Sequence, residues 1–228
     1  RRRQRQMCIR DRDISGPDGV PDGVIDDYDK TNIGSPMPKF TFGWTNTFRY
    51  KNFDLSVFIN GSYGNKVYNY LSMKLTHMNS PWTNQLNAVN GRAQLVPINP
   101  NKVYEDGTMW YNDVSNVMVA NPGASIPRAT INDPNDNDRI SDRYIEDGSY
   151  IRLKNISLGY TFPKKTIDKL GLSNLRIYAN IQNLLTITGY DGYDPEIGAS
   201  TSSVNVYGLD NGRYPSPTVY SFGLNVSF

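Results

Sequence analysis

The sequence predicts an all-β fold, a partial antiparallel transmembrane β-barrel of about five long strands with long extracellular loops. Three observations predict it. Five segments alternate large apolar residues with polar ones, the connections between them alternate between short and long, and aromatic residues gather toward the strand ends. Alternating strands, short turns at one end, longer loops at the other and girdles of aromatic residues are typical of β-barrels in outer membranes.

The clearest alternation predicts a hairpin with strands near residues 38–50 and 53–64. The even positions from 40 to 50 are aromatic except Asn46, and the odd positions hold Thr, Gly and Arg. A tight turn at Lys51-Asn52 follows, and apolar residues then occupy alternate positions from Phe53 onward. A period of two over this length indicates a strand with one apolar and one polar face.

Three further strands are predicted near residues 149–162, 175–187 and 218–228. Between them lie a short connection at 163–174, with room for one helical turn, and a longer loop at 188–217. If the chain ends on the periplasmic side, every short connection is periplasmic and every long one extracellular, as in known barrels.

The large outer loop, residues 65–147, is rich in Asn, Pro, Asp and Gly and has weak periodicity. We expect short helices or small strands there, but no second core. Insertions of this length in a compact domain are usually functional.

The composition excludes several classes of protein. Hydrophobic residues make up 38% of the 228, the mean hydropathy is −0.56, and no run of about 18 apolar residues predicts a membrane-spanning helix. One cysteine, Cys8, rules out a disulfide framework within the chain. A single histidine, His77, leaves no histidine-based metal site or triad unless His77 is used, and we expect it to be structural or exposed.

The basic residues are concentrated at the start of the sequence. Residues 1–12, RRRQRQMCIRDR, hold six of the 24 Lys and Arg, and the rest of the chain has 18 basic residues against 21 acidic ones. We interpret this segment as a non-native, adapter-derived string; the alternative is a basic arm for nucleic acid or anionic lipid. The remainder gives no general case for nucleic-acid binding.

Four segments resemble the C-terminal part of the SusC/RagA family, the TonB-dependent outer-membrane transporters of Bacteroidetes. They are distributed across nearly all of residues 13–228. They are GSPMPKFTFGWTNTFRYKNFDLSVFINGSYGNKVYN (34–69), YIEDGSYIRLKNISLGYTFP (144–163), LRIYANIQNLLTITGYDGYDPEI (175–197) and YPSPTVYSFGLNVSF (214–228).

The resemblance implies a larger barrel of about 22 strands, plugged by an N-terminal domain, in the cell outer membrane. It implies energised uptake of glycans or peptides, a SusD-like surface lipoprotein as lid, and TonB contacts through a region that this chain lacks. It also implies that Phe228, a terminal aromatic residue, is part of the signal read by the outer-membrane assembly machinery. No catalytic residue is expected.

An Asp- and Gly-rich stretch, residues 18–29, predicts a calcium loop. Counting twelve positions from Asp18 places hard oxygen ligands at alternating spacing with Gly23 at the sharp turn. Val20 at position 3 and an aspartate at position 12 depart from the usual pattern, so a solvated turn is the alternative. The candidate ligands are Asp18, Asp22, the Val24 carbonyl, Asp26 and Asp29.

Other acidic residues favour plainer interpretations. The run at 132–142, with Asp133, Asp136, Asp138 and Asp142, fits no ligand template and predicts a solvated loop. The pairs Glu146-Asp147 and Asp194-Glu196 could suggest a glycosidase, but loop or lumen polar residues are the favoured interpretation.

Aromatic residues in the outer loops are candidates for stacking on sugar rings, with internal packing as the alternative. They are Trp82, Trp110, Tyr111, Tyr190, Tyr193 and Tyr207. Two other functions stay open: a siderophore-type TonB receptor and a soluble extracellular carbohydrate-binding β-sandwich.

Overall fold

The structure is a computed structural model that describes residues 14–113, 115–131, 133, 137, 139–197 and 207–228. The chain forms two compact units. We call Gly34–Tyr68 with Glu146–Phe228 the sheet unit, and Arg1–Ile33 with Asn69–Ile145 the loop unit. Each is described by itself.

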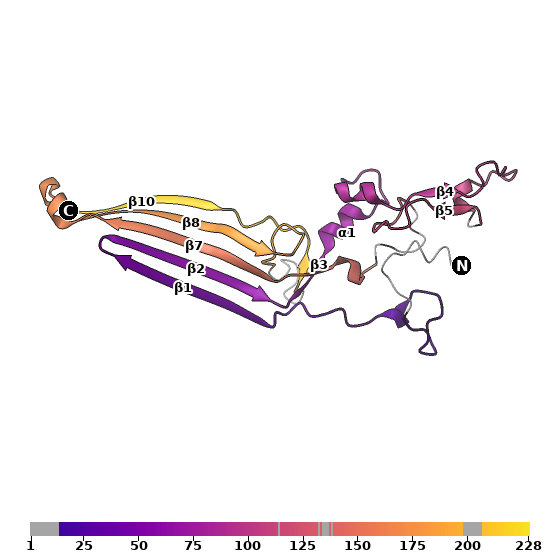
Figure 1. The fold of residues 1–228 in the computed structure, drawn as a ribbon, viewed down its shortest axis with the longest axis horizontal. Helices are drawn as coiled ribbons and strands as arrows, with labels where there is room; N and C mark the ends of the chain where they lie inside the picture. Colours follow the sequence, from indigo (N-terminus) through magenta and orange to yellow (C-terminus); the bar gives the residue numbers. More distant parts are fainter. Residues whose placement is uncertain (1–13, 114, 132, 134–136, 138, 198–206) are drawn as a thin grey trace. The chain divides into compact units, whose positions relative to one another are not determined.

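The sheet unit is built on five long strands that lie side by side (Figure 1). They are β1 (Phe40–Tyr50), β2 (Phe53–Tyr63), β7 (Tyr150–Thr161), β8 (Asn174–Thr188) and β10 (Val219–Ser227). The order is β1-β2-β7-β8-β10, and each neighbouring pair is antiparallel. The predicted fold class is confirmed: the chain is all-β, and its described residues form an antiparallel sheet of long strands that does not close into a barrel.

The register of the strands gathers the apolar residues on one face of the sheet. A row of paired residues crosses all five strands through Phe48, Leu55, Leu158, Ala179 and Phe222. Successive residues of a strand point to opposite faces, so the adjacent row belongs to the other face. That row is entirely polar and contains Thr47, Ser56, Ser157, Asn180 and Ser221.

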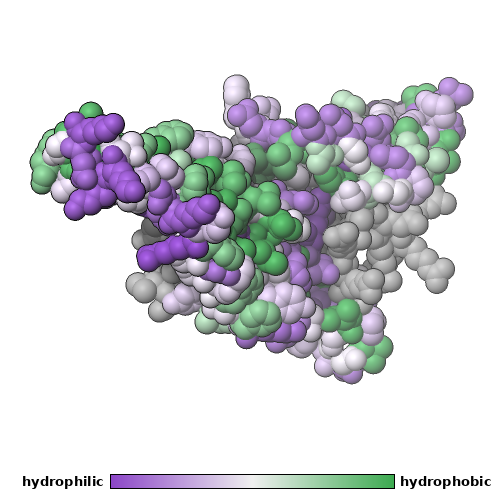
Figure 2. Space-filling model, turned by 60° about the vertical axis from the view of Figure 1, so that its left-hand side comes forward, coloured by the Kyte–Doolittle hydropathy of each residue, from purple (hydrophilic) through white to green (hydrophobic). Residues whose placement is uncertain are grey.

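The apolar face is largely uncovered in the chain. Phe222 is 84% exposed, and Figure 2 shows hydrophobic side chains gathered in patches on the visible surface. Exposed apolar patches of this kind mark a face that meets lipid or another protein.

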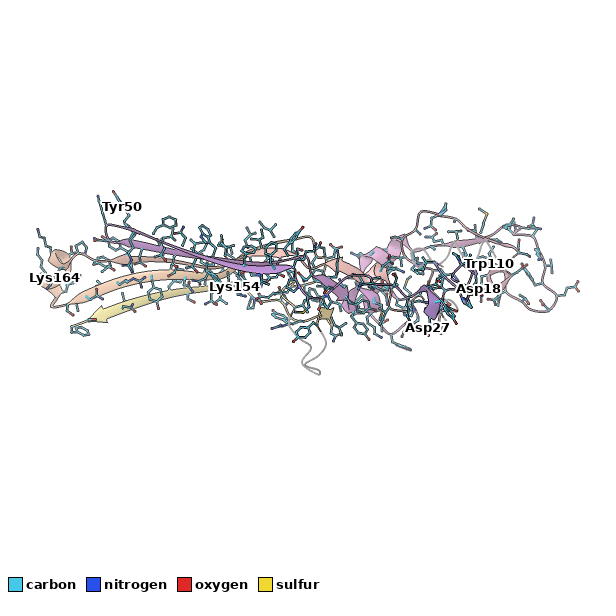
Figure 3. All side chains as sticks on the ribbon, turned by 90° about the horizontal axis from the view of Figure 1, so that it is seen from below. Asp18, Asp27, Tyr50, Trp110, Lys154 and Lys164 are labelled. Carbon is cyan, nitrogen blue, oxygen red and sulfur yellow. The ribbon has the colours of Figure 1, made fainter. Side chains whose placement is uncertain are left out.

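The short connections lie together at one end of the sheet. Lys51, at φ 52°, turns β1 into β2. Between β7 and β8 the chain forms α2 (Lys164–Ile167) and η6 (Asp168–Leu170), which ends at Gly171 with φ 69°. Tyr50 and Lys164 both lie at this end in Figure 3.

A β-bulge interrupts the sheet near its other end. Phe58 pairs with Asn155 and Ile59 with Leu153, so Lys154 has no partner on β2. The register between β7 and β8 shifts at the same place, where Asn183 has φ 52°. Beyond an extra residue in a strand, the odd- and even-numbered residues exchange the faces to which they point.

A second, small sheet gathers the bases of the long loops. Its strands are β3 (Lys66–Asn69), β6 (Ile145–Asp147) and β9 (Leu209–Asp210), in the order β6-β3-β9. The Tyr68 amide donates to the Gly208 carbonyl at 2.7 Å, and Val67 is only 1% exposed. The beginning of one outer loop is thereby joined to the end of another.

The loop unit holds short elements only. They are η2 (Asp27–Asp29), α1 (Tyr70–Thr76), η3 (Asn87–Gly91), β4 (Leu95–Pro97), η4 (Trp110–Asn112), β5 (Val117–Val119) and η5 (Asp142–Tyr144). None of the helices in the described ranges is long and apolar enough to cross a membrane.

The loop unit differs from one expectation, because it does bury a small set of apolar side chains. The Ala93 amide donates to the Ile126 carbonyl at 2.8 Å, which brings two distant segments together. The spacing of these residues is irregular, so no period revealed them. They are Met73, Ala93, Val117, Ala124, Ile126 and Tyr144.

Candidate functional site

The polar face of the sheet is the first candidate surface for function. It carries hydroxyl, amide and charged side chains across the width of the sheet. Near the turn end, Arg176 Nη2 on β8 lies 2.6 Å from Asp54 Oδ2 on β2. The pair reaches across the intervening strand above Gly159, where an added Cβ would lie 2.6 Å from Asp54 Oδ1. A polar face of this kind suits the water-filled side of a barrel wall.

At the other end of the polar face, Arg152 of β7 is buried among hydrogen-bond acceptors. Its Nε donates to Thr186 Oγ1 at 2.8 Å and its Nη1 to Glu196 Oε2 at 2.6 Å. Its Nη2 donates to Asp194 Oδ1, and Lys154 Nζ lies 2.7 Å from Glu196 Oε2. Asp194 and Glu196 were predicted as loop or lumen polar residues, and the structure places them in this cluster.

The carboxyl group of Asp194 is held in its charged form. Burial raises its pKa, but hydrogen bonds from the Ser216 amide, Arg152 and the Glu196 amide lower it, and the net shift is downward. A carboxylate bound in this way by cations and amides is a structural acceptor. It lacks the raised pKa that a general acid of a glycosidase needs.

Tyr190 lies inside the fold, although the sequence offered it as a stacking residue. It is 5% exposed, and its hydroxyl donates to Asp210 Oδ2 at 2.5 Å. Burial, together with the Asp210 carboxylate, raises the pKa of the phenol. In this structure the ring packs inside the fold, and stacking of Tyr190 on a ligand stays a prediction.

The other aromatic candidates offer more open rings. Trp82 is 92% exposed, and Tyr111, Tyr193 and Tyr207 are also exposed. Trp110 is half-buried, and its ring meets that of Tyr111 edge-on at a centroid distance of 5.7 Å. Trp82, Trp110 and Tyr111 belong to the loop unit and Tyr193 and Tyr207 to the sheet unit, so stacking on a ligand stays a prediction for each.

The predicted calcium loop uses its carboxylates to bind its own backbone. Asp22 Oδ1 accepts from the Val24 amide at 2.8 Å, and Asp26 Oδ1 accepts from the Tyr28 amide at 2.8 Å. Asp29 accepts from the amides of Ile14, Ser15 and Asp26, and these bonds lower its pKa.

No three Asp, Glu, His or Cys side chains among the described residues converge as metal ligands. Calcium binding by Asp18, Asp22, Val24, Asp26 and Asp29 stays a prediction. The test is titration of the protein with calcium. Binding that is lost in the Asp22→Ala and Asp26→Ala variants would support the prediction, and the absence of calcium binding would contradict it.

The second acidic run is less uniform than predicted. Asp133 is buried, and its Oδ2 lies 3.0 Å from Nε2 of His77, which gives that histidine a structural partner. Asp142 is exposed, as a solvated loop requires. Asp136 and Asp138 lie outside the described residues, as does the segment 1–12.

Phe228 follows the last residue of β10 and is exposed. Its role in assembly stays a prediction. Arg152, Lys154 and Asp210 were not singled out from the sequence, because a single polar residue in a strand or a loop carries no mark of burial.

The chain is similar in sequence to several known proteins. The sequence is 36% identical over 211 residues to TonB-dependent receptor P3 of Formosa agariphila, a match that covers 90% of this chain and 18% of the relative. It is 29% identical to TonB-dependent receptor SusC of Bacteroides thetaiotaomicron, covering 90% of this chain and 17% of that protein. The chain is SusC/RagA-like. It spans about a fifth of the length of these curated relatives. No protein-family model matches the sequence.

Solved structures show the same fold for this SusC/RagA-like chain. The RagAB peptide importer in its closed-closed state superposes with a TM-score of 0.65 at 21% identity, covering 93% of this chain and 20% of that one. The RagAB peptide transporter gives a TM-score of 0.62 over 86% of this chain. At this identity the likeness concerns the fold alone.

Proposed function

We propose that this chain is part of the barrel wall of an outer-membrane, TonB-dependent importer. The observation that carries the proposal is the pair of rows across the sheet, one apolar throughout and one polar throughout. A wall between lipid and a water-filled lumen needs this division, whereas the inner faces of a soluble sandwich bury their apolar rows against each other. The relatives named as TonB-dependent receptors support it.

The proposed substrate class is glycan, with peptide as the second candidate. Exposed aromatic rings in both units, such as Trp82 and Tyr193, are flat apolar surfaces of the kind that sugar C–H faces cover. The peptide candidate is favoured by the fold of the RagAB peptide importer. We propose no bond chemistry for this chain: its contribution is wall, lumen surface and loop scaffold.

We propose that the whole protein works with a SusD-like surface lipoprotein and draws energy from TonB through its other parts. The test is to purify the full-length protein from outer membranes and identify what comes with it. A co-purifying surface lipoprotein, and binding of oligosaccharides rather than peptides, would support the proposal in its first form. Peptide binding would support the second candidate. Recovery of the protein from the soluble fraction would contradict both.

A further inference from the structure

The stretch GYDGYDPEI, residues 189–197, follows β8 and is held against the sheet by two side chains of β7, Arg152 and Lys154. The Arg152 side chain is 4% exposed, and its Nε, Nη1 and Nη2 each have an acceptor within hydrogen-bond distance. Two of those acceptors, Asp194 and Glu196, belong to this stretch. The third, Thr186, lies on the neighbouring strand, so the guanidinium joins two strands to the loop.

The cluster balances its charges. Arg152 and Lys154 provide two cations, and Asp194 and Glu196 provide two carboxylates. Both cations come from β7, and both bond Glu196 Oε2, so both lie on the same face of the sheet. Figure 3 shows Lys154 on the sheet, away from the turn end that Lys164 marks.

The Asp194 carboxylate also joins the two ends of the loop between β8 and β10. Asp194 Oδ1 accepts from the Glu196 amide at 2.9 Å, and Oδ2 accepts from the Ser216 amide at 3.0 Å. A second buried carboxylate, Asp210, accepts from the Tyr190 hydroxyl and from the Gly212 amide at 2.8 Å. Both ends of the loop are therefore tied to buried groups.

Removing one member of a buried ion pair leaves the partner charge unpaired and desolvated, which strongly destabilises the local structure. Here a single arginine neutralises a carboxylate that itself orders two distant amides. Loss of Arg152 would release residues 189–197 and the segment near Ser216 together, because both depend on Asp194.

We propose that Arg152 anchors the outer loop between β8 and β10, so that residues 189–197 and 209–217 form a fixed part of the mouth of the barrel and not a moving gate. Asp194 and Glu196 are then anchor residues, and ligand contacts fall to exposed side chains such as Tyr193. The inference rests on contacts inside the sheet unit and does not depend on whether the substrate is a glycan or a peptide. Its failure would leave the proposed import function standing.

The test is hydrogen–deuterium exchange of the full-length protein in detergent micelles. In the parent protein, peptides covering residues 189–197 and 209–217 exchange slowly, because their amides are tied to buried groups. Arg152→Met raises exchange at the Glu196 and Ser216 amides together, by roughly tenfold or more. Arg152→Lys gives an intermediate rise, since a single ammonium cannot reach all three acceptors.

The matched control is Arg176→Met, which removes an arginine–carboxylate pair from the turn end of the same sheet. It leaves exchange at Glu196 and Ser216 unchanged. If Arg152→Met prevents barrel assembly, seen as loss of heat-modifiable migration on gels, Glu196→Gln and Asp194→Asn replace it, with the larger rise at Ser216 expected for Asp194→Asn. Fast exchange of both segments in the parent protein, or no rise in any variant, would overturn the proposal.

Discussion

At the scale of single residues, glycines on the polar face make room for larger side chains on the next strand. Gly223 of β10 pairs with Tyr178 of β8, and a Cβ on Gly223 would overlap the tyrosine ring. The guanidinium of Arg176 lies over the same ring at 5.3 Å from its centroid. The glycine therefore supports an arrangement that includes the Asp54–Arg176 pair.

This arrangement predicts unequal effects of two glycine substitutions. Gly223→Ala forces a rigid ring to move and is expected to lower the free energy of unfolding by about 1–3 kcal/mol. Gly123→Ala is the control, because no atom lies within 4 Å of the position that its Cβ would take. We expect that change to stay within about 0.5 kcal/mol. Urea unfolding of the full-length protein in micelles measures both, and equal effects would contradict the account.

The downward shift in the pKa of Asp194 predicts how the anchor responds to pH. A carboxyl group whose pKa is lower in the folded state stabilises the fold at pH values above its ordinary pKa, near 3.8. This stabilisation is lost as the pH falls through the pKa of the folded state. Exchange at Ser216, corrected for the intrinsic rate, should therefore be the same at pH 7 and pH 5 and rise only below about pH 4. A rise between pH 7 and pH 5 would show that Asp194 is not held in this way.

At the scale of elements, the alternation of residue types was enough to predict the long strands. Predicted strands near 38–50 and 53–64 correspond to Phe40–Tyr50 and Phe53–Tyr63. The period of two works here because one face is apolar on every strand. The loop unit has no strands that share an apolar face, so its sequence shows no regular period. Its buried residues were therefore missed.

The bulge at Lys154 was also missed, although the sequence holds its trace. Ile156, Leu158 and Tyr160 are apolar at even positions, whereas Ile151 and Leu153 are apolar at odd positions. Such a change of parity within one strand requires an extra residue. The anchor around Arg152 could not be predicted in this way, because it depends on how a distant loop folds back.

Two aromatic residues of the predicted loops, Tyr190 and Trp82, are expected to differ in their contribution to stability, because one is buried and the other exposed. Tyr190→Phe leaves the buried Asp210 carboxylate without its hydroxyl donor and should lower the free energy of unfolding by about 1–3 kcal/mol. Trp82→Ala removes a ring that is almost fully exposed and should change it by less than about 0.5 kcal/mol. Thermal unfolding of both variants measures this, and a larger loss for Trp82→Ala would contradict the assignment of Tyr190 to the interior.

At the scale of the whole molecule, the five-stranded sheet has two edges, β1 and β10, that pair with no other strand among the described residues. Unpaired backbone groups are too costly to expose inside lipid, so these edges must pair with further strands if the sheet crosses a membrane. The match of this chain to about a fifth of each curated relative is consistent with that requirement. In the proposed barrel, lipid covers the apolar row and water covers the polar row.

The measurement that tests this claim most directly is the accessibility of spin labels along β10 in the full-length protein, reconstituted in lipid. Labels at Phe222 and Leu224 should meet oxygen dissolved in the acyl chains, and labels at Ser221 and Asn225 should meet a water-soluble nickel complex, alternating with a period of two. If labels at Phe222 and Leu224 reach neither reagent, the apolar face is a dry protein core, and the membrane-barrel account is wrong.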